Sequence, residues 1–182
     1  MHPLKHLKVI LKHRHQVMRH CFRAGIGFQG LRHDLSKFSP EEFIAGARYF
    51  QGNRSPNEGE REAIGYSRAW MHHKGRNKHH FEYWTDYDPV KKLMQPVPMP
   101  VRYIAEMFCD RVAASKVYLK DKYDNGSALA YFHRGKANRK IHPDTAAILE
   151  NWLITLSEQG EQAAFAAVKA AVKAEKAANR VN

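Results

Sequence analysis

The chain has few of the features that mark an exported or membrane-bound protein. It contains only two cysteines, Cys21 and Cys109, and they do not form a CxxC pair. This argues against a disulfide framework and favours two packed thiols in a reducing compartment. No apolar run approaches the ~18 residues of a membrane span, and the first residues lack the apolar segment of a signal peptide. We therefore expect a cytoplasmic protein without a membrane partner.

Acidic residues are scarce relative to basic ones. Thirty Lys and Arg residues stand against 18 Asp and Glu, which gives a formal charge of +12. Such a charge attracts polyanions over a long range and favours a phosphate-containing small molecule or a nucleic acid as the partner. Lysines that only keep the protein in solution explain the same composition. Charge alone does not choose between these interpretations.

The spacing of apolar residues predicts an all-α fold. The 182 residues show no internal repeat and are long enough for a single domain with its own core. Apolar residues recur at the three-to-four spacing of amphipathic helices. The pattern predicts helices at 4–23, 40 to about 52, 58–73, 101–119 and 127–133, a helix capped by Asp144, and, after Gly160, a helix from 161 to about 179.

Two local signals refine these boundaries. Ser39 and Glu42 have the spacing of a capping box, with Pro40 at the first helical position, so a helix is expected to start at Pro40. We expect Phe43, Ile44, Ala47 and Phe50 on its buried face. Four prolines within 86–100 predict an extended connection rather than a helix.

Histidines and aspartates recur along the chain in a way that indicates metal binding. His33 and Asp34 are adjacent and offer an imidazole and a carboxylate to one ion, and two histidine pairs follow at 72–73 and 79–80. Two pairs so close together exceed what a solvated surface usually collects. In the first helix the candidate ligand is His13, with His15 and His20 as alternatives. His6 and His15 are expected to face solvent.

Asp110 is a candidate metal ligand because of its position on the predicted 101–119 helix. It shares one stripe of the 101–119 helix with the apolar residues Tyr103, Met107, Ala114 and Val117. Burying an ionised aspartate is costly unless a cation or hydrogen bonds compensate it. We therefore expect Asp110 to be buried against the metal, and pairing with Arg102 or Arg111 is the alternative.

Together these residues predict a metal site. The candidate ligands are His13, His33, Asp34, His73, His79, His80 and Asp110. This mixture of nitrogen and carboxylate donors suits a divalent transition metal and does not choose among Mn, Fe, Ni and Zn. One ion needs only four to six ligands, whereas this number supports two ions about 3.5–4 Å apart with Asp34 as a bridge, an arrangement that clamps phosphoryl groups.

The order His, His-Asp, His, His, Asp on a helical chain resembles the HD-domain superfamily of metal-dependent phosphohydrolases, over roughly residues 4–119. The segment 33–37, HDLSK, matches the HD-x-x-K form of that superfamily. The combination of 33–43, then His73 with 77–84, then 106–110 looks like an uncharacterised bacterial and phage family related to these enzymes. The resemblance implies a single-domain, HD-domain-like helical bundle, with a metal-binding core at 1–120 and C-terminal helices at 121–182.

The resemblance also implies a function and roles for individual residues. We expect hydrolysis of a phosphate ester, from a nucleotide or a nucleic-acid-derived substrate, with Asp34 and Lys37 as the catalytic residues. Lys37 can instead simply pair with Asp34 at helical spacing. The expected substrate-binding residues are Arg32, Arg76, Asn77 and Glu82. The alternatives are a di-iron oxygenase on the same fold and a non-catalytic basic protein whose aromatic stretch at 74–84 binds nucleic acid.

Overall fold

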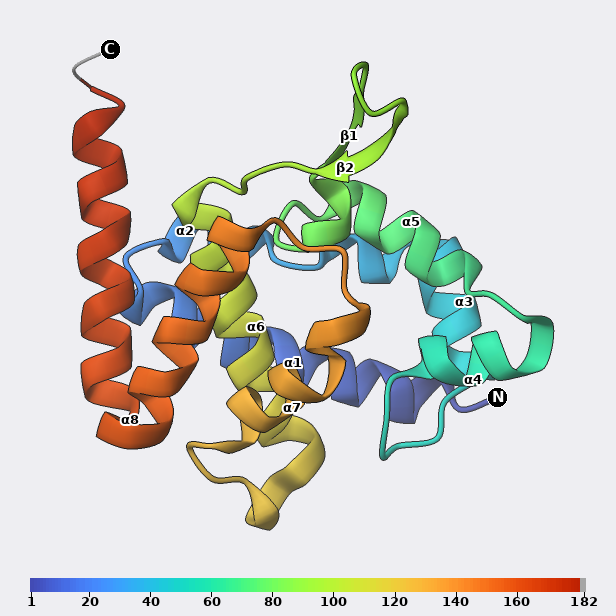
Figure 1. Ribbon diagram of the computed structural model, residues 1–182. Helices are drawn as coiled ribbons and strands as arrows, with labels where there is room; N and C mark the ends of the chain where they lie inside the picture. The colour runs from blue at the N-terminus through green and yellow to red at the C-terminus, as the bar shows by residue number, and fades with distance from the viewer. Residues whose placement is uncertain (181–182) are drawn as a thin grey trace.

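The computed structural model describes residues 1–180 and is built almost entirely from helices (Figure 1). Its α-helices are α1 (Pro3–Arg23), α2 (Gly27–Arg32), α3 (Pro40–Arg48), α4 (Pro56–Ile64), α5 (Arg68–Arg76), α6 (Val101–Leu119), α7 (Ser127–Gly135) and α8 (Pro143–Ala178). Short 3-10 turns join them at η1 (Leu35–Phe38), η2 (Phe81–Tyr83), η3 (Lys120–Lys122) and η4 (Lys136–Asn138). The predicted all-α fold is confirmed, with one small hairpin as the exception.

That hairpin lies inside the proline-rich segment predicted to be extended. Strands β1 (Thr85–Asp88) and β2 (Leu93–Pro96) pair antiparallel, with Thr85 opposite Pro96. The carboxylate of Asp88 accepts hydrogen bonds from the backbone N–H groups of Val90 and Lys91, which holds the turn. The hairpin projects from the body of the molecule in Figure 1. The absence of helix here was predicted, and the strand pairing was not.

Helix α6 runs through the middle of the fold and packs against α1 and α8 (Figure 1). Its Phe108 is fully buried and meets the rings of Trp152 and Phe165 edge-on at 6.2 and 5.4 Å. The two cysteines are free and buried in this same core, as expected. The core unites residues from both sides of position 120, while residues 181 and 182 of the predicted C-terminal part lie outside the described residues.

Helix α8 combines the two last helices of the prediction. Gly160 has φ 81° and ψ 178°, so the chain changes direction there, as the sequence indicated. The expected cap at Asp144 is wrong: His142 is the N-cap residue, and its Nδ1 accepts a hydrogen bond from the backbone N–H of Asp144 at 3.2 Å. Pro143 then occupies the first helical position, where its missing N–H costs nothing.

The second half of α8 is fixed to α1 and α6 by charge. Glu161 forms ion pairs with Arg23 at 2.6 Å and with Lys116. Further along, the carboxylate of Glu175 accepts hydrogen bonds from the backbone N–H groups of Val101 and Arg102, at 2.5 and 3.0 Å. These are otherwise unpaired donors of the first turn of α6. The C-terminal half of the chain therefore helps to position the helix that carries Asp110.

Two helix boundaries in the N-terminal half differ from the prediction. The helix expected at 58–73 is two helices, because Gly65 takes a left-handed conformation with φ 83° and ends α4. Ser67 then caps α5 by accepting a hydrogen bond from the backbone N–H of Trp70, and α5 continues to Arg76. Helix α3 starts at Pro40 as predicted but ends at Arg48, earlier than expected.

The expectation that His6 faces solvent is wrong. His6 is only 8% exposed, because α3 covers the start of α1, with Phe43 of α3 and Phe50 just beyond its end against the His6 ring. Gly46 makes this approach possible, since a Cβ atom there would lie 2.1 Å from His6 Nε2. The reverse error concerns Ile44, which was expected to be buried and is 51% exposed. His15 is exposed as predicted.

Among the described residues, no helix combines the length and the apolar character that crossing a bilayer requires.

Candidate metal centre

The seven predicted ligands come from five segments and meet in one place. α1 contributes one, the corner between α2 and η1 contributes two, α5 one, the loop before η2 two, and α6 one. They fall into overlapping groups whose donor atoms lie within 4.8 Å of one another. The groups are Asp34, His73, His79 and His80; His13, His33 and Asp110; and His33, His79 and Glu106.

The α2–η1 corner lets two adjacent side chains point into the same interior. Helix α2 lasts only six residues, after which His33 is extended and Asp34 adopts a left-handed conformation with φ 52° and ψ 30°. Aspartate is among the few residues that tolerate this conformation. Gly30 allows α2 to lie close to α1, since a Cβ atom there would sit 2.4 Å from the Cβ of Cys21. Both His33 and Asp34 are consequently buried.

One oxygen of Asp34, Oδ2, lies beside His33, a member of the group formed by His13, His33 and Asp110. His33 Nε2 lies 3.4 Å from Asp34 Oδ2 and 3.7 Å from Asp110 Oδ1. His13 Nε2 approaches the same Asp110 oxygen at 2.9 Å. The donor atoms of His13, His33 and Asp110 therefore lie close together, and Asp34 Oδ2 adjoins this group at His33.

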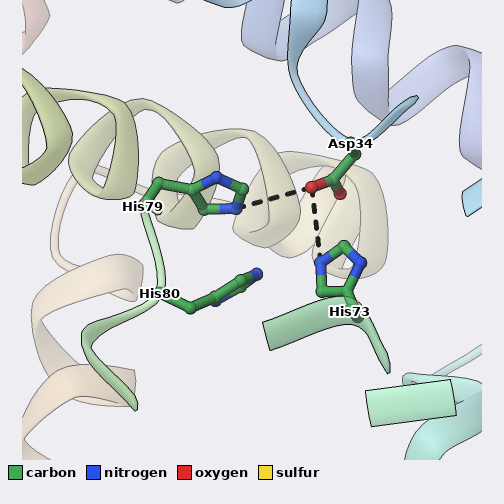
Figure 2. Close-up of side chains that lie close together, drawn as sticks. All are labelled: Asp34, His73, His79 and His80. Atoms are coloured by element: carbon green, nitrogen blue, oxygen red, sulfur yellow. Dashed lines mark ion pairs between the residues drawn. The ribbon is translucent and has the colours of Figure 1, made fainter. Parts of the chain in front are cut away.

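The other oxygen of Asp34, Oδ1, faces the group formed by His73, His79 and His80. His73 Nε2 and His79 Nε2 lie 3.3 and 3.5 Å from Asp34 Oδ1. The His80 ring is 4.1 Å from the His79 ring and 4.8 Å from the His73 ring, between centroids. Figure 2 shows the three rings arranged around the carboxylate, with a nitrogen of His80 directed into the space between them.

The hydrogen-bonding state of these atoms fits a metal. Four buried atoms of the cluster that could bind a metal have no hydrogen-bond partner within residues 1–180. They are His33 Nε2, Asp34 Oδ1, His79 Nε2 and His80 Nε2. Buried polar atoms are rarely left in this state, because it costs free energy. Two ligand atoms about 2.1 Å from one ion, at ordinary coordination angles, lie about 3.0–3.4 Å apart. The 3.3–3.5 Å separations around Asp34 are close to that spacing.

Two glutamates that sequence reasoning missed orient the imidazoles. Glu106 Oε1 accepts hydrogen bonds from the Nδ1 atoms of His33 at 2.9 Å and His79 at 3.2 Å. Glu42 accepts from the Nδ1 atom of His73 at 2.7 Å. Such bonds fix the ring tautomer and leave Nε2 as the ligand atom, as in known metal sites. Glu106 was within reach of sequence reasoning, because it lies one helical turn before Asp110.

The sequence predicted a different role for Glu42, as part of a capping box with Ser39. Its backbone N–H does donate to the Ser39 hydroxyl at 3.4 Å, so half of the predicted capping box is present. Its carboxylate does not close that box and instead bonds the Nδ1 atoms of His72 and His73, both at 2.7 Å. A residue that matched a capping pattern therefore has a second role in the site.

The charges in the cluster support one another. Burial raises the pKa of Asp34, but His33 and Lys37 outweigh it and hold this pKa well below its usual range. Burial likewise opposes ionisation of Glu106, yet hydrogen bonds from His33 and His79 lower its pKa to about 2. For His80, burial lowers the pKa well below the usual value, which keeps the ring neutral. Burial lowers the pKa of His79, but the Glu106 carboxylate outweighs it and raises this pKa to about 9. Metals bind ionised carboxylates and neutral imidazoles, so His79 has to release a proton when an ion binds.

His15 and His20, the alternatives to His13 as the ligand from the first helix, lie outside the donor groups. His15 is exposed. His20 is buried, but its Nδ1 lies 3.2 Å from the backbone oxygen of Cys109 and its ring packs on Phe165. Of the three histidines, His13 is the one that the structure brings to the cluster.

Asp110 is less enclosed than its helical stripe predicted. Its side chain is 19% exposed, because it opens onto a cavity. The alternative pairing with Arg102 or Arg111 is absent from the described residues, since His13 and His33 are its partners. Lys37 Nζ lies 3.1 Å from Asp34 Oδ2, so the helical pair that the sequence offered does form.

The cavity beside the cluster has a volume of about 520 Å³. Lys37 and Glu82 line it, and burial raises the pKa of Glu82. The other three expected substrate-binding residues do not. Arg32 and Arg76 are exposed outside it, and Asn77 is buried with its amide nitrogen donating to Ser36 Oγ and the His73 backbone oxygen, both at 2.8 Å. The structure gives Asn77 a supporting position instead.

The fold and site define a helical protein with buried His, Asp and Glu groups that can hold metal ions. Residues 2–155 match the family of unknown function DUF5662, and the chain belongs to this family. No curated protein and no solved structure matches the chain. The family description names neither the HD superfamily nor an activity, so the resemblance to HD enzymes stays a prediction.

Proposed function

We propose that the protein is an HD-type phosphohydrolase that binds two divalent transition-metal ions. The observation that carries this proposal is the placement of Asp34. Its Oδ2 faces His33 in one donor group and its Oδ1 faces His73 and His79 in the other, so one carboxylate can bridge two ions. Two-metal centres of this kind suit displacement at phosphorus.

Four donors are available for each ion. His13, His33 and Asp110 would hold one together with Asp34 Oδ2, which lies beside His33, and Asp34 Oδ1, His73, His79 and His80 would hold the other. When bound, such ions lower the pKa of a bound water toward neutrality and polarise a phosphoryl oxygen. Asp34 would orient the attacking water, and the Lys37 ammonium, 3.1 Å from Asp34, would neutralise charge on the phosphate.

Charge around the cavity favours a phosphate ester over the alternatives. A di-iron oxygenase would use the same ligands but has no need of an ammonium beside the bridging carboxylate. Lys37, Arg111 and Arg139 all line the cavity, which suits an anionic substrate. A non-catalytic nucleic-acid-binding protein would not explain why four buried donor atoms lack hydrogen-bond partners.

The test is metal content together with turnover. We expect the purified protein, reconstituted with Mn²⁺ and desalted, to retain about two ions per chain by elemental analysis and to hydrolyse p-nitrophenyl phosphate. Asp34→Asn keeps the volume and the tolerance of a left-handed conformation but weakens the bridge, so it should lose metal and turnover. His15→Asn, an exposed histidine on α1, should behave like the parent.

Two outcomes would overturn the proposal. One is a parent protein that retains no metal after reconstitution, and the other is Asp34→Asn with unchanged metal content and turnover. An iron-loaded protein that consumes oxygen but releases no phosphate would favour the oxygenase instead.

A further inference from the structure

The cavity contains a second charged region, formed around Arg111. This residue follows Asp110 on α6, and successive helical residues point about 100° apart, so its side chain leaves the helix in a different direction from the metal ligand. Its guanidinium lies 5.9 Å from the centre of the Phe132 ring on α7. Lys37 belongs to the other region, beside Asp34. Both residues line the same cavity.

Within residues 1–180, the guanidinium of Arg111 has no acceptor stronger than a thioether sulfur. Its Nε is buried without a hydrogen-bond partner, and the one contact of Nη2 is the sulfur of Met107 at 3.9 Å. No carboxylate within residues 1–180 lies in ion-pair range of it. A weakly hydrated cation without a partner is costly to bury. The cation–π contact with Phe132 engages none of the N–H donors of the group, and the weak contact with the Met107 sulfur engages one of its five.

The surroundings of Arg111 suit an anion. Arg139 approaches the same Phe132 ring at 6.0 Å, and its Nη atoms already donate to the backbone oxygens of Phe132 and Tyr131. The acidic groups that act on Arg111 are Asp110 and Glu82. Asp110 is paired with His13 and His33, so of these two carboxylates only Glu82 remains opposite the two guanidinium groups. A planar guanidinium with free donors matches the two oxygens of a phosphate or a carboxylate.

We propose that Arg111 binds a second acidic group of the substrate, so that the preferred substrate carries two such groups in one molecule. The group to be hydrolysed lies beside Lys37 and Asp34, and the other, a phosphate or a carboxylate, lies at Arg111. This inference rests on the proposed phosphohydrolase function only for the identity of the first group, the phosphate that is hydrolysed. Recognition by Arg111 depends on the free guanidinium in the cavity.

Pairs of probes that differ by one acidic group test this inference. Binding to the Mn²⁺-loaded protein is measured by calorimetry for adenosine 3′,5′-bisphosphate against adenosine 5′-monophosphate, and for 3-phosphoglycerate against glycerol 3-phosphate. The first pair differs by a phosphate and the second by a carboxylate. In at least one pair the parent should bind the molecule with two groups about 10-fold more tightly or better, as charge-assisted hydrogen bonds predict. The pair that shows the preference identifies the second group.

Substitutions assign that preference to Arg111. Arg111→Gln should reduce the ratio within the pair to near one and leave the weaker probe's affinity little changed. Arg102→Gln is the matched control, because Arg102 is exposed on the same helix, stacks on Tyr103 at 5.1 Å and lies outside the cavity. Arg111→Lys keeps the charge and loses the planar fork, so it is the second variant if Arg111→Gln does not fold. It should lower the ratio at least threefold.

The inference is overturned if the parent shows no preference in either pair, or if folded Arg111 variants keep the parental ratio. Metal content and phosphate release, measured on the same samples, keep this result separate from the proposed function. A parent that hydrolyses p-nitrophenyl phosphate but shows no preference refutes the role of Arg111 alone. A parent that prefers the molecule with two groups but releases no phosphate supports Arg111 and refutes the hydrolase.

Discussion

Replacing Glu106 by glutamine tests whether the glutamates behind the histidines tune the metal centre. Glu106 Oε1 accepts hydrogen bonds from His33 and His79, which belong to different donor groups. Its other oxygen, Oε2, accepts a hydrogen bond from the side-chain nitrogen of Gln29. Glutamine has nearly the same shape, but one of its two terminal atoms is a donor. Whichever way the amide turns, a donor faces either Gln29 or the two histidines.

The expected loss can be estimated from this geometry. Removing a group that orients metal-bound histidines typically weakens metal binding 10- to 100-fold, or about 1.4 to 2.7 kcal/mol. At saturating metal the stabilisation by binding falls by the same amount. For a chain of this size, 1 kcal/mol corresponds to about 2–4 °C in melting temperature. The metal-induced rise in melting temperature should therefore be about 3 to 11 °C smaller in Glu106→Gln than in the parent.

The assay is thermal unfolding with chelator and with excess Mn²⁺, beside a direct competition measurement of metal affinity. Glu161→Gln is the control, because Glu161 pairs with Arg23 and Lys116 and takes no part in the donor groups. It should lower the melting temperature equally with and without metal. A Glu106→Gln protein with parental metal affinity would refute the argument, since its hydrogen bonds would then be structural only.

Three further predictions follow from individual residues. Burial lowers the pKa of His20 from 6.5 to about 4, so between these values the unfolded chain binds more protons and the unfolding free energy falls on acidification. His20→Gln should make the decrease in unfolding free energy between pH 7 and 4.5 smaller by about 2 to 3 kcal/mol. Urea unfolding at the two pH values measures this decrease, and a decrease equal to that of the parent would assign it to other groups. Asp110→Asn should weaken metal binding at least about 10-fold in a competition assay, because its oxygen faces both His13 and His33; full retention would remove Asp110 from the site. Lys37→Ala should keep its metal and lose phosphate release, and parental turnover would show that the ion pair with Asp34 is structural.

Sequence reasoning succeeded where one element carries the information. The limits of α6 were predicted to the residue, because a proline precedes Val101 and the apolar repeat continues to Leu119. His33 and Asp34 could be paired because they are adjacent. Asp110 stood out because its helical neighbours are apolar. Each of these inferences needs only helix phase or adjacency, and neither depends on how the helices pack.

Sequence reasoning failed where the position or role of a residue depends on a contact between two helices or loops. His6 is buried because α3 crosses the start of α1, and no local pattern on α1 reveals that contact. Glu106 bonds histidines 73 and 27 positions away, so its role appears only once α6, the α2–η1 corner and the loop before η2 are assembled. Arg32 and Arg76 were expected to bind substrate, but they are exposed and lie outside the cavity.

The left-handed backbone at Asp34 explains how the adjacent residues His33 and Asp34 can both belong to one site. In a regular helix, neighbouring side chains point about 100° apart, which makes it harder for both to face one centre. Ending α2 at Arg32, extending His33 and turning Asp34 to φ 52° brings both side chains inward. A non-glycine residue in this region costs about 1 kcal/mol or more, and such costs are typical of functional sites. Here the turn directs the two carboxylate oxygens toward different imidazoles, Oδ2 toward His33 and Oδ1 toward His73 and His79.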